Sequence, residues 1–411
     1  MNILYLTLKN PVLTEAGIYP DLINALTAAG HKVTIAFADS PANTPQTKIV
    51  TECGVRILKV ASGEIFGVGF IKKGINTLKL EPKLKSAIKA FLKDESFDMV
   101  LYATPPVTFA NVVRFCKKTY GCRAFLMLKD IFPQNAVDIG LFSKGGPIHK
   151  YFRLKEKNLY ALSDVIGCMS EGNIRYLKQH DPEIPEDKMI LFPNTINPPA
   201  DEGDGQVSKG SAISGEEHGA KEGTEPESGN NKKLRLIFGG NLGKPQAIGY
   251  LMDVIRYDRS PIYDKVEFLF VGNGSEAALV KRVCDECDNA TFYDFMKPDE
   301  YDRLMSSCDV GIVSLDARFT IPNYPSRMLS YMAMKKPMIA CTDPNTDVKE
   351  LLTKEANCGL WCRSDDVKGF WDCIEELIDD DRRKILGQNG RKYLEENFNV
   401  TRSVEIIEQY G

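Results

Sequence analysis

The chain has 411 residues, enough for two or three domains, and its 43% hydrophobic and 26% charged residues are typical of globular proteins. No apolar run reaches the length of a membrane-spanning helix. The first residues lack the basic start and long apolar core of a signal peptide, so we expect a cytoplasmic protein. The 11 cysteines favour free thiols in a reducing compartment. The 4 histidines lack metal-ligand spacing, which argues against a metallohydrolase.

The net charge of −4 hides an asymmetry along the chain. Residues 1–199 carry 25 Lys+Arg against 18 Asp+Glu, whereas residues 233–411 carry 24 against 30. Residues 200–232 are acidic, rich in Gly and Ser, and contain no aromatic residue. Such a segment cannot bury enough apolar surface to offset its ordering entropy, so we predict a disordered linker or insertion there.

Strands and helices alternate before this segment. We predict strands at 2–8, 32–37, 55–60, 98–103, 123–128, 165–169 and 189–192, and helices at 19–29 and 107–118.

The alternation continues after the segment. We predict strands at 234–238, 266–271, 290–293, 310–315 and 338–341, helices at 275–286, 298–306 and 326–336, and a mostly helical end at 374–410. The pattern indicates an α/β protein with two βαβ domains, residues 1–199 and 233–390, and a cleft between them where a ligand could bind.

The most informative stretch runs from Tyr324 to Ala340. Ser326 is a good helix N-cap, Lys335 and Lys336 suit a helix C-terminus, and Pro337 ends the helix. This helix starts at the carboxyl edge of the sheet, where α/β folds place ligands. A helix start with a Ser hydroxyl and the side chain of Arg327 favours a phosphate, although an ordinary helix packed on a sheet explains the same spacing.

Two glycine-containing turns follow strands of the second half. Gly240, Asn241 and Lys244 follow the first strand, and Gly272 and Gly274 follow the second. Glycine lets the backbone approach a ligand closely, and Lys244 could add a charge for a phosphate. Plain turns account for both motifs equally well.

Asp130 ends a strand in the first half, in the segment Leu128-Lys129-Asp130-Ile131-Phe132-Pro133. A carboxylate at this edge can orient or deprotonate a hydroxyl group. The alternative is a capping or turn residue.

Residues 63–93 combine an apolar cluster with a lysine-rich stretch. Ile65, Phe66 and Phe70 precede Lys72 and Lys73, and further lysines follow. This composition suits an anionic membrane surface. The alternative is a core loop followed by a solvated helix face.

Taken together, these motifs resemble the family 4 glycosyltransferases of the two-domain GT-B class, in particular bacterial enzymes that build O-antigen, capsule and exopolysaccharide. The resemblance covers nearly the whole chain outside 200–232. It is carried by Asn2-Ile3-Leu4-Tyr5, Ala29-Gly30-His31-Lys32-Val33-Thr34, Leu128-Lys129-Asp130-Ile131-Phe132-Pro133, Phe192-Pro193-Asn194, Gly240-Asn241-Leu242-Gly243-Lys244-Pro245-Gln246, Val271-Gly272-Asn273-Gly274 and Pro325-Ser326-Arg327.

The resemblance implies that residues 233–390 bind a nucleotide-diphosphate sugar as a co-substrate, with no metal and no other cofactor. Arg327 and Lys244 would contact the diphosphate, and Asp130 would lie near the attacking hydroxyl. Residues 391–411 would form a helix that returns to the first domain. The remaining implied donor contacts are Gly240, Asn241, Gly272, Gly274, Met296, Ser326 and Ser330.

Three positions depart from the family pattern. Pro322 and Ser330 stand where many members have the two glutamates of an E-x7-E motif. Asn241 replaces a common arginine. Many members also have a pair of glycines near the N-terminus, where the acceptor would bind, and this chain has only Gly17 there.

We therefore predict a retaining, metal-independent hexosyltransferase for cell-surface polysaccharide, acting on a glycan or a polyprenyl-diphosphate-linked acceptor. It would be cytoplasmic, with a possible peripheral site on the inner face of the cell membrane. Two alternatives remain open: a nucleotide-sugar 2-epimerase on the same scaffold, and a non-catalytic two-domain sugar-binding protein. Nucleic acid is not expected as a partner, because few aromatic residues accompany the basic ones.

Overall fold

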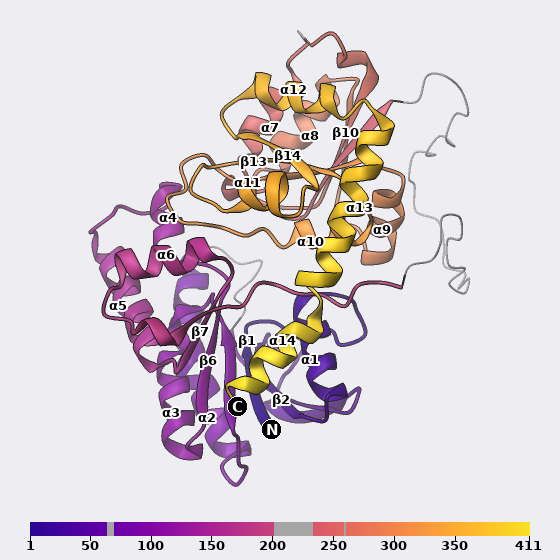
Figure 1. The fold of residues 1–411 in the computed structure, drawn as a ribbon. Helices are drawn as coiled ribbons and strands as arrows, with labels where there is room; N and C mark the ends of the chain where they lie inside the picture. Colours follow the sequence, from indigo (N-terminus) through magenta and orange to yellow (C-terminus); the bar gives the residue numbers. More distant parts are fainter. Residues whose placement is uncertain (64–69, 201–232, 259) are drawn as a thin grey trace.

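The computed structural model describes residues 1–63, 70–200, 233–258 and 260–411, and it places only the backbone of residues 70–79. Figure 1 shows two lobes, each built on one twisted sheet, with α13 (Asp380–Asn397) on the upper lobe followed by α14 (Val400–Gln409) on the lower one. The predicted disorder of 200–232 concerns residues outside the described part, apart from Ala200.

The N-terminal lobe contains a sheet of eight strands in the order β3-β4-β2-β1-β5-β6-β7-β8. All neighbouring pairs are parallel except β3 and β4. The strands are β1 (Asn2–Thr7), β2 (Lys32–Asp39), β3 (Lys48–Glu52), β4 (Val55–Ala61), β5 (Met99–Ala103), β6 (Arg123–Leu128), β7 (Val165–Cys168) and β8 (Met189–Leu191). The α-helices are α1 (Ile18–Ala28), α2 (Phe70–Phe91), α3 (Ala110–Tyr120), α4 (Gln134–Asp138), α5 (Pro147–Leu162) and α6 (Glu171–His180), with short turns η1 (Val107–Phe109) and η2 (Glu186–Lys188).

The C-terminal lobe contains a sheet of six parallel strands in the order β11-β10-β9-β12-β13-β14. The strands are β9 (Leu234–Gly239), β10 (Val266–Val271), β11 (Ala290–Tyr293), β12 (Val310–Ser314), β13 (Met338–Thr342) and β14 (Gly359–Arg363). The α-helices are α7 (Ile248–Ile255), α8 (Ala277–Glu286), α9 (Pro298–Ser306), α10 (Arg327–Ala333), α11 (Val348–Glu350), α12 (Val367–Glu376), α13 (Asp380–Asn397) and α14 (Val400–Gln409), with short turns η3 (Lys244–Gln246), η4 (Tyr263–Lys265) and η5 (Leu351–Glu355).

The predicted α/β class with two Rossmann-like domains is confirmed. The central strands are apolar runs buried on both faces, as parallel sheets covered by helices require. The edge strands β3 and β14 and the helices α4, α5, α6, α7 and α11 were not predicted, and α12 begins before the predicted helical end at residue 374. Strand β3 is short, polar and exposed along part of its length, so it lacks the apolar pattern on which the prediction relied.

The helix predicted at 326–336 is shorter than expected. It ends at Ala333, and Lys335 has a φ of 53°, which lies outside the helical region. Lys335 and Lys336 therefore follow the helix instead of forming its last turn.

The chain crosses between the lobes twice, and the two crossings pair with each other. The backbone N–H of Ile196 donates to the carbonyl of Phe398 at 3.0 Å, and that of Val400 donates to the carbonyl of Ile196 at 2.9 Å. Beyond this point α14 lies beside α1 (Figure 1), and Val404 and Ile407 are buried in the core of the N-terminal lobe. The carboxyl edges of both sheets therefore face a common space.

Candidate active site

A cleft of about 500 Å³ lies between the two lobes, at the carboxyl ends of their strands. Parallel α/β sheets bind ligands at this edge because backbone groups and loop side chains converge there. The residues that line it from the N-terminal lobe are Tyr19, Thr104, Pro105, Lys129, Asp130, Phe132, Asn135, Ala136, Ile139 and Leu141. Those from the C-terminal lobe are Pro245, Gln246, Ser314, Leu315, Phe319, Asn323, Tyr324, Pro325, Ser326 and Arg327.

One wall of the cleft is an arm, residues 315–326, which joins β12 to α10. Its apolar side chains Leu315, Phe319 and Ile321 belong to the hydrophobic core of the N-terminal lobe. Phe319 is 3% exposed and Ile321 is fully buried. The arm therefore belongs to the C-terminal lobe but packs into the core of the N-terminal lobe. The arm ends at Ser326, directly before Arg327.

Polar contacts hold the arm and its surroundings against the N-terminal lobe. The carboxylate of Asp138 accepts hydrogen bonds from the backbone N–H of Thr320 at 2.8 Å and from its hydroxyl at 2.9 Å. The carboxylate of Asp347 accepts a hydrogen bond from the backbone N–H of Gly172 and pairs with Arg175 at 2.6 Å. These bonds hold the two lobes in one relative position across the cleft.

Arg327 is the first residue of α10, and its side chain reaches back over the end of β9. The guanidinium carbon lies 4.2 Å from the centroid of the Phe238 ring, and the guanidinium passes close to Gly240, where an added Cβ would lie 3.6 Å from its Nη2. Its Nη1 atom is buried and has no hydrogen-bond partner in the part of the chain that the structure describes. Burial lowers the pKa of Arg327 from its ordinary value, although a guanidinium stays protonated at neutral pH. A buried cation without a counter-charge is expensive, so an anionic ligand would relieve it.

Ser326 lies at the N-cap position of α10, but the prediction that its side chain caps the helix is wrong. Its backbone is helical and its side chain makes no capping hydrogen bond. The N–H groups of Met328 and Leu329 donate instead to the carbonyls of Pro325 and Ser326, at 3.3 and 3.1 Å. Fewer free N–H groups remain at this helix start than the sequence predicted, and the hydroxyl of Ser326 is left for the cleft.

Asp130 faces Ser326 and Arg327 from the N-terminal lobe, as another lining residue of the same cleft. Asn135 donates its side-chain amide to both carboxylate oxygens, at 2.8 and 2.7 Å. Burial raises the pKa of Asp130 to about 6, while the bonds from Asn135 and from the N–H of Ile131 oppose that rise. Near neutral pH the carboxylate is ionised and fixed, so it can accept a hydrogen bond from a substrate hydroxyl.

Lys129 also lines the cleft, and the sequence analysis gave it no role. Its ammonium lies 5.1 Å from the centroid of the Phe192 ring, and no carboxylate among the described residues pairs with it. Burial lowers the pKa of Lys129 to about 7. A lysine that follows a strand is usually solvated, so the sequence gives no sign that Lys129 differs from other surface lysines. Its position in the cleft is known only from the structure.

The two glycine turns of the C-terminal lobe pack against each other. A side chain at Gly272 would lie 1.9 Å from the carbonyl oxygen of Gly240, and one at Gly274 would lie 2.3 Å from the carbonyl oxygen of Leu242. The N–H of Leu242 donates to the carbonyl of Asn273 at 2.8 Å. Close backbone packing therefore accounts for Gly272 and Gly274, whether or not a ligand also contacts them.

The other predicted donor residues surround the cleft without lining it. Lys244 is exposed and begins η3, directly before the lining residues Pro245 and Gln246. The side-chain amide of Asn241 donates to that of Gln246 at 2.7 Å. Ser330 is exposed on α10, one turn after Ser326.

Met296 and Gly17 also lie outside the lining. Met296 is half-buried against the core of the C-terminal lobe, and its neighbour Phe295 is 71% exposed. Gly17 precedes α1, two residues before the lining residue Tyr19, and its N–H donates to Asp21 at 3.2 Å.

The membrane residues predicted in 63–93 fall largely outside the described side chains. Ile65 and Phe66 lie outside the described residues, and Phe70, Lys72 and Lys73 are described only by their helical backbone in α2. Within the described ranges no helix is long and apolar enough to cross a membrane, and no group of three or more His, Cys, Asp or Glu side chains could hold a metal ion.

Two family models match the chain, one for each lobe. Residues 21–199 match the model described as Glycosyltransferase Family 4, and residues 233–380 match Glycosyl transferases group 1. The chain is a family 4 glycosyltransferase. This glycosyltransferase is 23% identical over 313 residues to the probable glycosyltransferase WbjE of Pseudomonas aeruginosa, an alignment that covers 75% of this chain and 72% of the relative.

Solved structures confirm that the glycosyltransferase has the GT-B fold. Sucrose-phosphate synthase from Thermosynechococcus elongatus has a TM-score of 0.72 at 16% identity, with 100% of this chain and 98% of the other covered. HepE from Anabaena in complex with UDP-glucose has a TM-score of 0.67 at 12% identity, covering 100% and 99%. At these identities the likeness concerns the fold alone.

Proposed function

We propose that this glycosyltransferase moves a sugar, with retention of configuration, from a nucleotide-diphosphate sugar to a hydroxyl of a glycan or lipid-linked acceptor of cell-surface polysaccharide. The observation that carries the proposal is the buried guanidinium of Arg327, whose Nη1 has no partner in the described structure and which lines a cleft shared with Asp130. The complex of HepE with UDP-glucose supports a nucleotide sugar as donor.

The proposed chemistry follows from the charge that develops on the leaving group. When the bond to the sugar breaks, negative charge accumulates on the nucleoside diphosphate, and Arg327, whose Nη1 is buried, stabilises it from a fixed position. A charge-assisted hydrogen bond contributes about 1.5–3 kcal/mol, or about 10–150-fold in rate if it forms fully only in the transition state. Lys244, one residue before the cleft lining, reaches the same phosphates as a flexible point charge.

Asp130 acts on the acceptor side in this proposal. Its carboxylate, held by Asn135, accepts a hydrogen bond from the attacking hydroxyl and orients it. Retention requires attack on the face of the sugar that the leaving group occupies, so an oxygen of the departing diphosphate takes the hydroxyl proton. In this mechanism Asp130 orients the acceptor hydroxyl, and it need not be the base that removes the proton.

The test is a panel of nucleotide sugars with Arg327→Ala and a matched control. We expect Arg327→Ala to lower kcat/KM by about 10–150-fold without unfolding the protein. Arg318→Ala removes another arginine of the same arm, which is exposed and paired with Asp316, and should leave kcat/KM near the wild-type value. EDTA should not change the rate if Arg327 and Lys244 supply the positive charge.

Three results would contradict parts of this proposal. Near-normal activity of Arg327→Ala would remove Arg327 from the donor site. Product formed from the donor alone would indicate a 2-epimerase, although residues 233–411 contain no histidine to serve as its acid or base. Tight sugar binding without affinity for any nucleotide would indicate a non-catalytic binding protein.

A further inference from the structure

Four exposed apolar side chains, here called the apolar patch, lie in residues 141–154, a segment that starts at the cleft-lining Leu141. Leu141, Ile148, Tyr151 and Leu154 are 62%, 50%, 39% and 60% exposed, and large apolar side chains this exposed are few in the described structure. The last three are spaced three residues apart on α5, so they share one face of that helix. A soluble protein rarely gathers such side chains on its surface without a partner.

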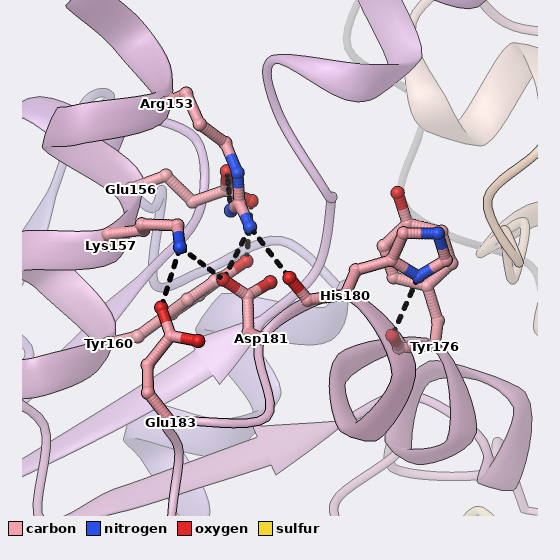
Figure 2. A network of polar contacts seen from close by, with 8 residues as sticks. All are labelled: Arg153, Glu156, Lys157, Tyr160, Tyr176, His180, Asp181 and Glu183. Carbon is pink, nitrogen blue, oxygen red and sulfur yellow. Dashed lines mark hydrogen bonds and ion pairs between the residues drawn. The ribbon is translucent and has the colours of Figure 1, made fainter. Parts of the chain in front are cut away.

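The opposite face of α5 is fixed to the N-terminal lobe, as Figure 2 shows. Arg153 contacts the buried carboxylates of Glu156 and Asp181, and the Tyr160 hydroxyl donates to Glu156 at 2.8 Å. Leu159 is fully buried. Since this network holds the inner face in place, the helix cannot rotate to bury the apolar patch.

The surroundings of the patch are basic. Residues 141–157 contain four lysines and one arginine against the single acid Glu156. Three of these cations are paired with acids: Arg153 with Glu156 and Asp181, Lys155 with Glu81 and Lys157 with Glu183. Lys144 and Lys150 are exposed, and neither forms an ion pair with any residue that the structure describes. The Lys155 ammonium lies 5.8 Å from the ring centroid of Tyr151. Exposed apolar side chains next to unpaired cations are complementary to an anionic lipid bilayer, in which negatively charged headgroups cover an apolar layer of acyl chains.

The patch continues into the cleft through a chain of aromatic contacts. Leu141 itself lines the cleft. The Phe132 ring, another lining residue, has its centroid 6.0 Å from that of Phe142 and 4.9 Å from that of Phe152 on α5. A molecule anchored at the patch could therefore extend from it into the cleft beside Asp130.

We propose that residues 141–154 dock on an anionic lipid membrane and bring the mouth of the cleft to its surface. The acceptor is then a lipid-linked saccharide, whose chain stays in the membrane while its sugar enters the cleft. This statement about the acceptor rests on the proposed function, whereas the docking itself does not. The sequence predicted a membrane contact at 63–93, whose apolar residues and first lysines lie outside the described side chains, so that prediction stays untested and this proposal concerns a different surface.

The test is co-sedimentation of the full chain with phosphatidylcholine vesicles that contain about one-third phosphatidylglycerol. We expect binding that weakens with added salt. Ile148→Ser with Leu154→Ser should weaken binding at least about tenfold, because both side chains lose their place in the apolar layer. Lys144→Gln with Lys150→Gln should weaken it about 25-fold, at about fivefold for each lysine.

The matched control changes Ile378 and Ile385 to Ser. These two side chains are 40% and 51% exposed on the C-terminal lobe, outside the patch. Binding to vesicles should be unchanged in this control. Circular dichroism and thermal melting should show that all variants fold as the wild type does.

Three outcomes would overturn the docking proposal. The first is vesicle binding that the patch variants leave unchanged. The second is binding that is lost only when Lys72, Lys73 and Lys79 become Glu, which would assign the contact to the start of α2. The third is a wild-type dimer in light scattering that the patch variants convert to monomer without affecting vesicle binding, which would make the patch a contact between copies.

Activity separates this proposal from the proposed function. Transfer to a water-soluble acceptor should be equal in the wild type and the patch variants, whereas transfer to a vesicle-borne acceptor should fall in the variants. A protein that binds vesicles as expected but transfers no sugar from any donor would leave the docking intact and contradict the proposed function.

Discussion

Replacing Asp138 by Ala tests whether the seated arm controls catalysis. The carboxylate of Asp138 accepts two hydrogen bonds from Thr320, at 2.8 and 2.9 Å, across the lobe boundary. Both residues are partly exposed, so each bond is expected to contribute about 0.5–1.5 kcal/mol instead of the full value for a buried charged pair. Losing both removes about 1–3 kcal/mol from the seating of the arm, which changes the ratio of seated to unseated arm by about 5–150-fold.

The arm leads directly into Ser326 and Arg327, so an unseated arm would not hold the guanidinium opposite Asp130. We therefore expect Asp138→Ala to lower kcat/KM by up to the same factor. Thr320→Val keeps the backbone N–H and loses the hydroxyl's bond to Asp138 together with a long bond from Gln134 at 3.4 Å, and should cost about fivefold. The assay is the steady-state release of nucleoside diphosphate in the presence of acceptor.

The double variant makes the reasoning refutable. If the two residues act through their mutual bonds, Thr320→Val should have almost no effect once Asp138 is Ala. Asp365→Ala is the control, because among the described residues this exposed carboxylate pairs only with Arg363 on the C-terminal lobe. Wild-type kcat/KM in Asp138→Ala, or equal costs of Thr320→Val with and without Asp138, would show that seating of the arm does not govern the reaction.

Two further predictions concern titratable groups. Arg153→Met leaves the carboxylates of Glu156 and Asp181 buried without their guanidinium, and should cost about 3–5 kcal/mol of unfolding free energy at pH 8 in urea titrations. Burial already raises the pKa of Glu156 to about 7, so the loss should shrink as the pH falls toward 5 and Glu156 protonates, and a constant loss would contradict this. The control Lys178→Met, at the exposed ion pair with Glu186, should cost under about 1 kcal/mol. The second prediction concerns activity: kcat/KM should decrease at acidic pH, with a midpoint near pH 6, as Asp130 becomes protonated. Asp130→Asn should be less active, and its kcat/KM should not show this decrease. If Asp130→Asn shows the same decrease, another group is responsible for it.

The fold could be predicted from local patterns because buried parallel strands are continuous apolar runs. Strand β6 at Arg123–Leu128 and strand β10 at Val266–Val271 were predicted with their observed bounds. Strand β3 was missed because an edge strand exposed to solvent carries no such pattern. Helix α5 was missed because its Arg153 and its buried Glu156 look like solvated residues until their partner Asp181 is known.

The candidate site was predictable only in part. Arg327 and Asp130 stood out through their positions at strand and helix ends, and both line the cleft. Gly272 and Gly274 also stood out, but the structure gives them a packing role that the sequence could not separate from ligand binding. Lys129 was missed, because nothing in its neighbours reveals that its ammonium is buried beside Phe192.

The sequence by itself determined the alternation of strands and helices, the two domains that follow from it, and the chemical types of the residues at the strand ends, because all of these depend on contacts between near neighbours in the chain. Only the tertiary structure decided that an arm of one lobe is seated in the core of the other, that the Nη1 of Arg327 is left without a hydrogen-bond partner among the described residues, and that Leu141 of the apolar patch lines the cleft. Those properties depend on which groups from distant segments come together and which are left without a partner, and burial and pairing across the chain fix them.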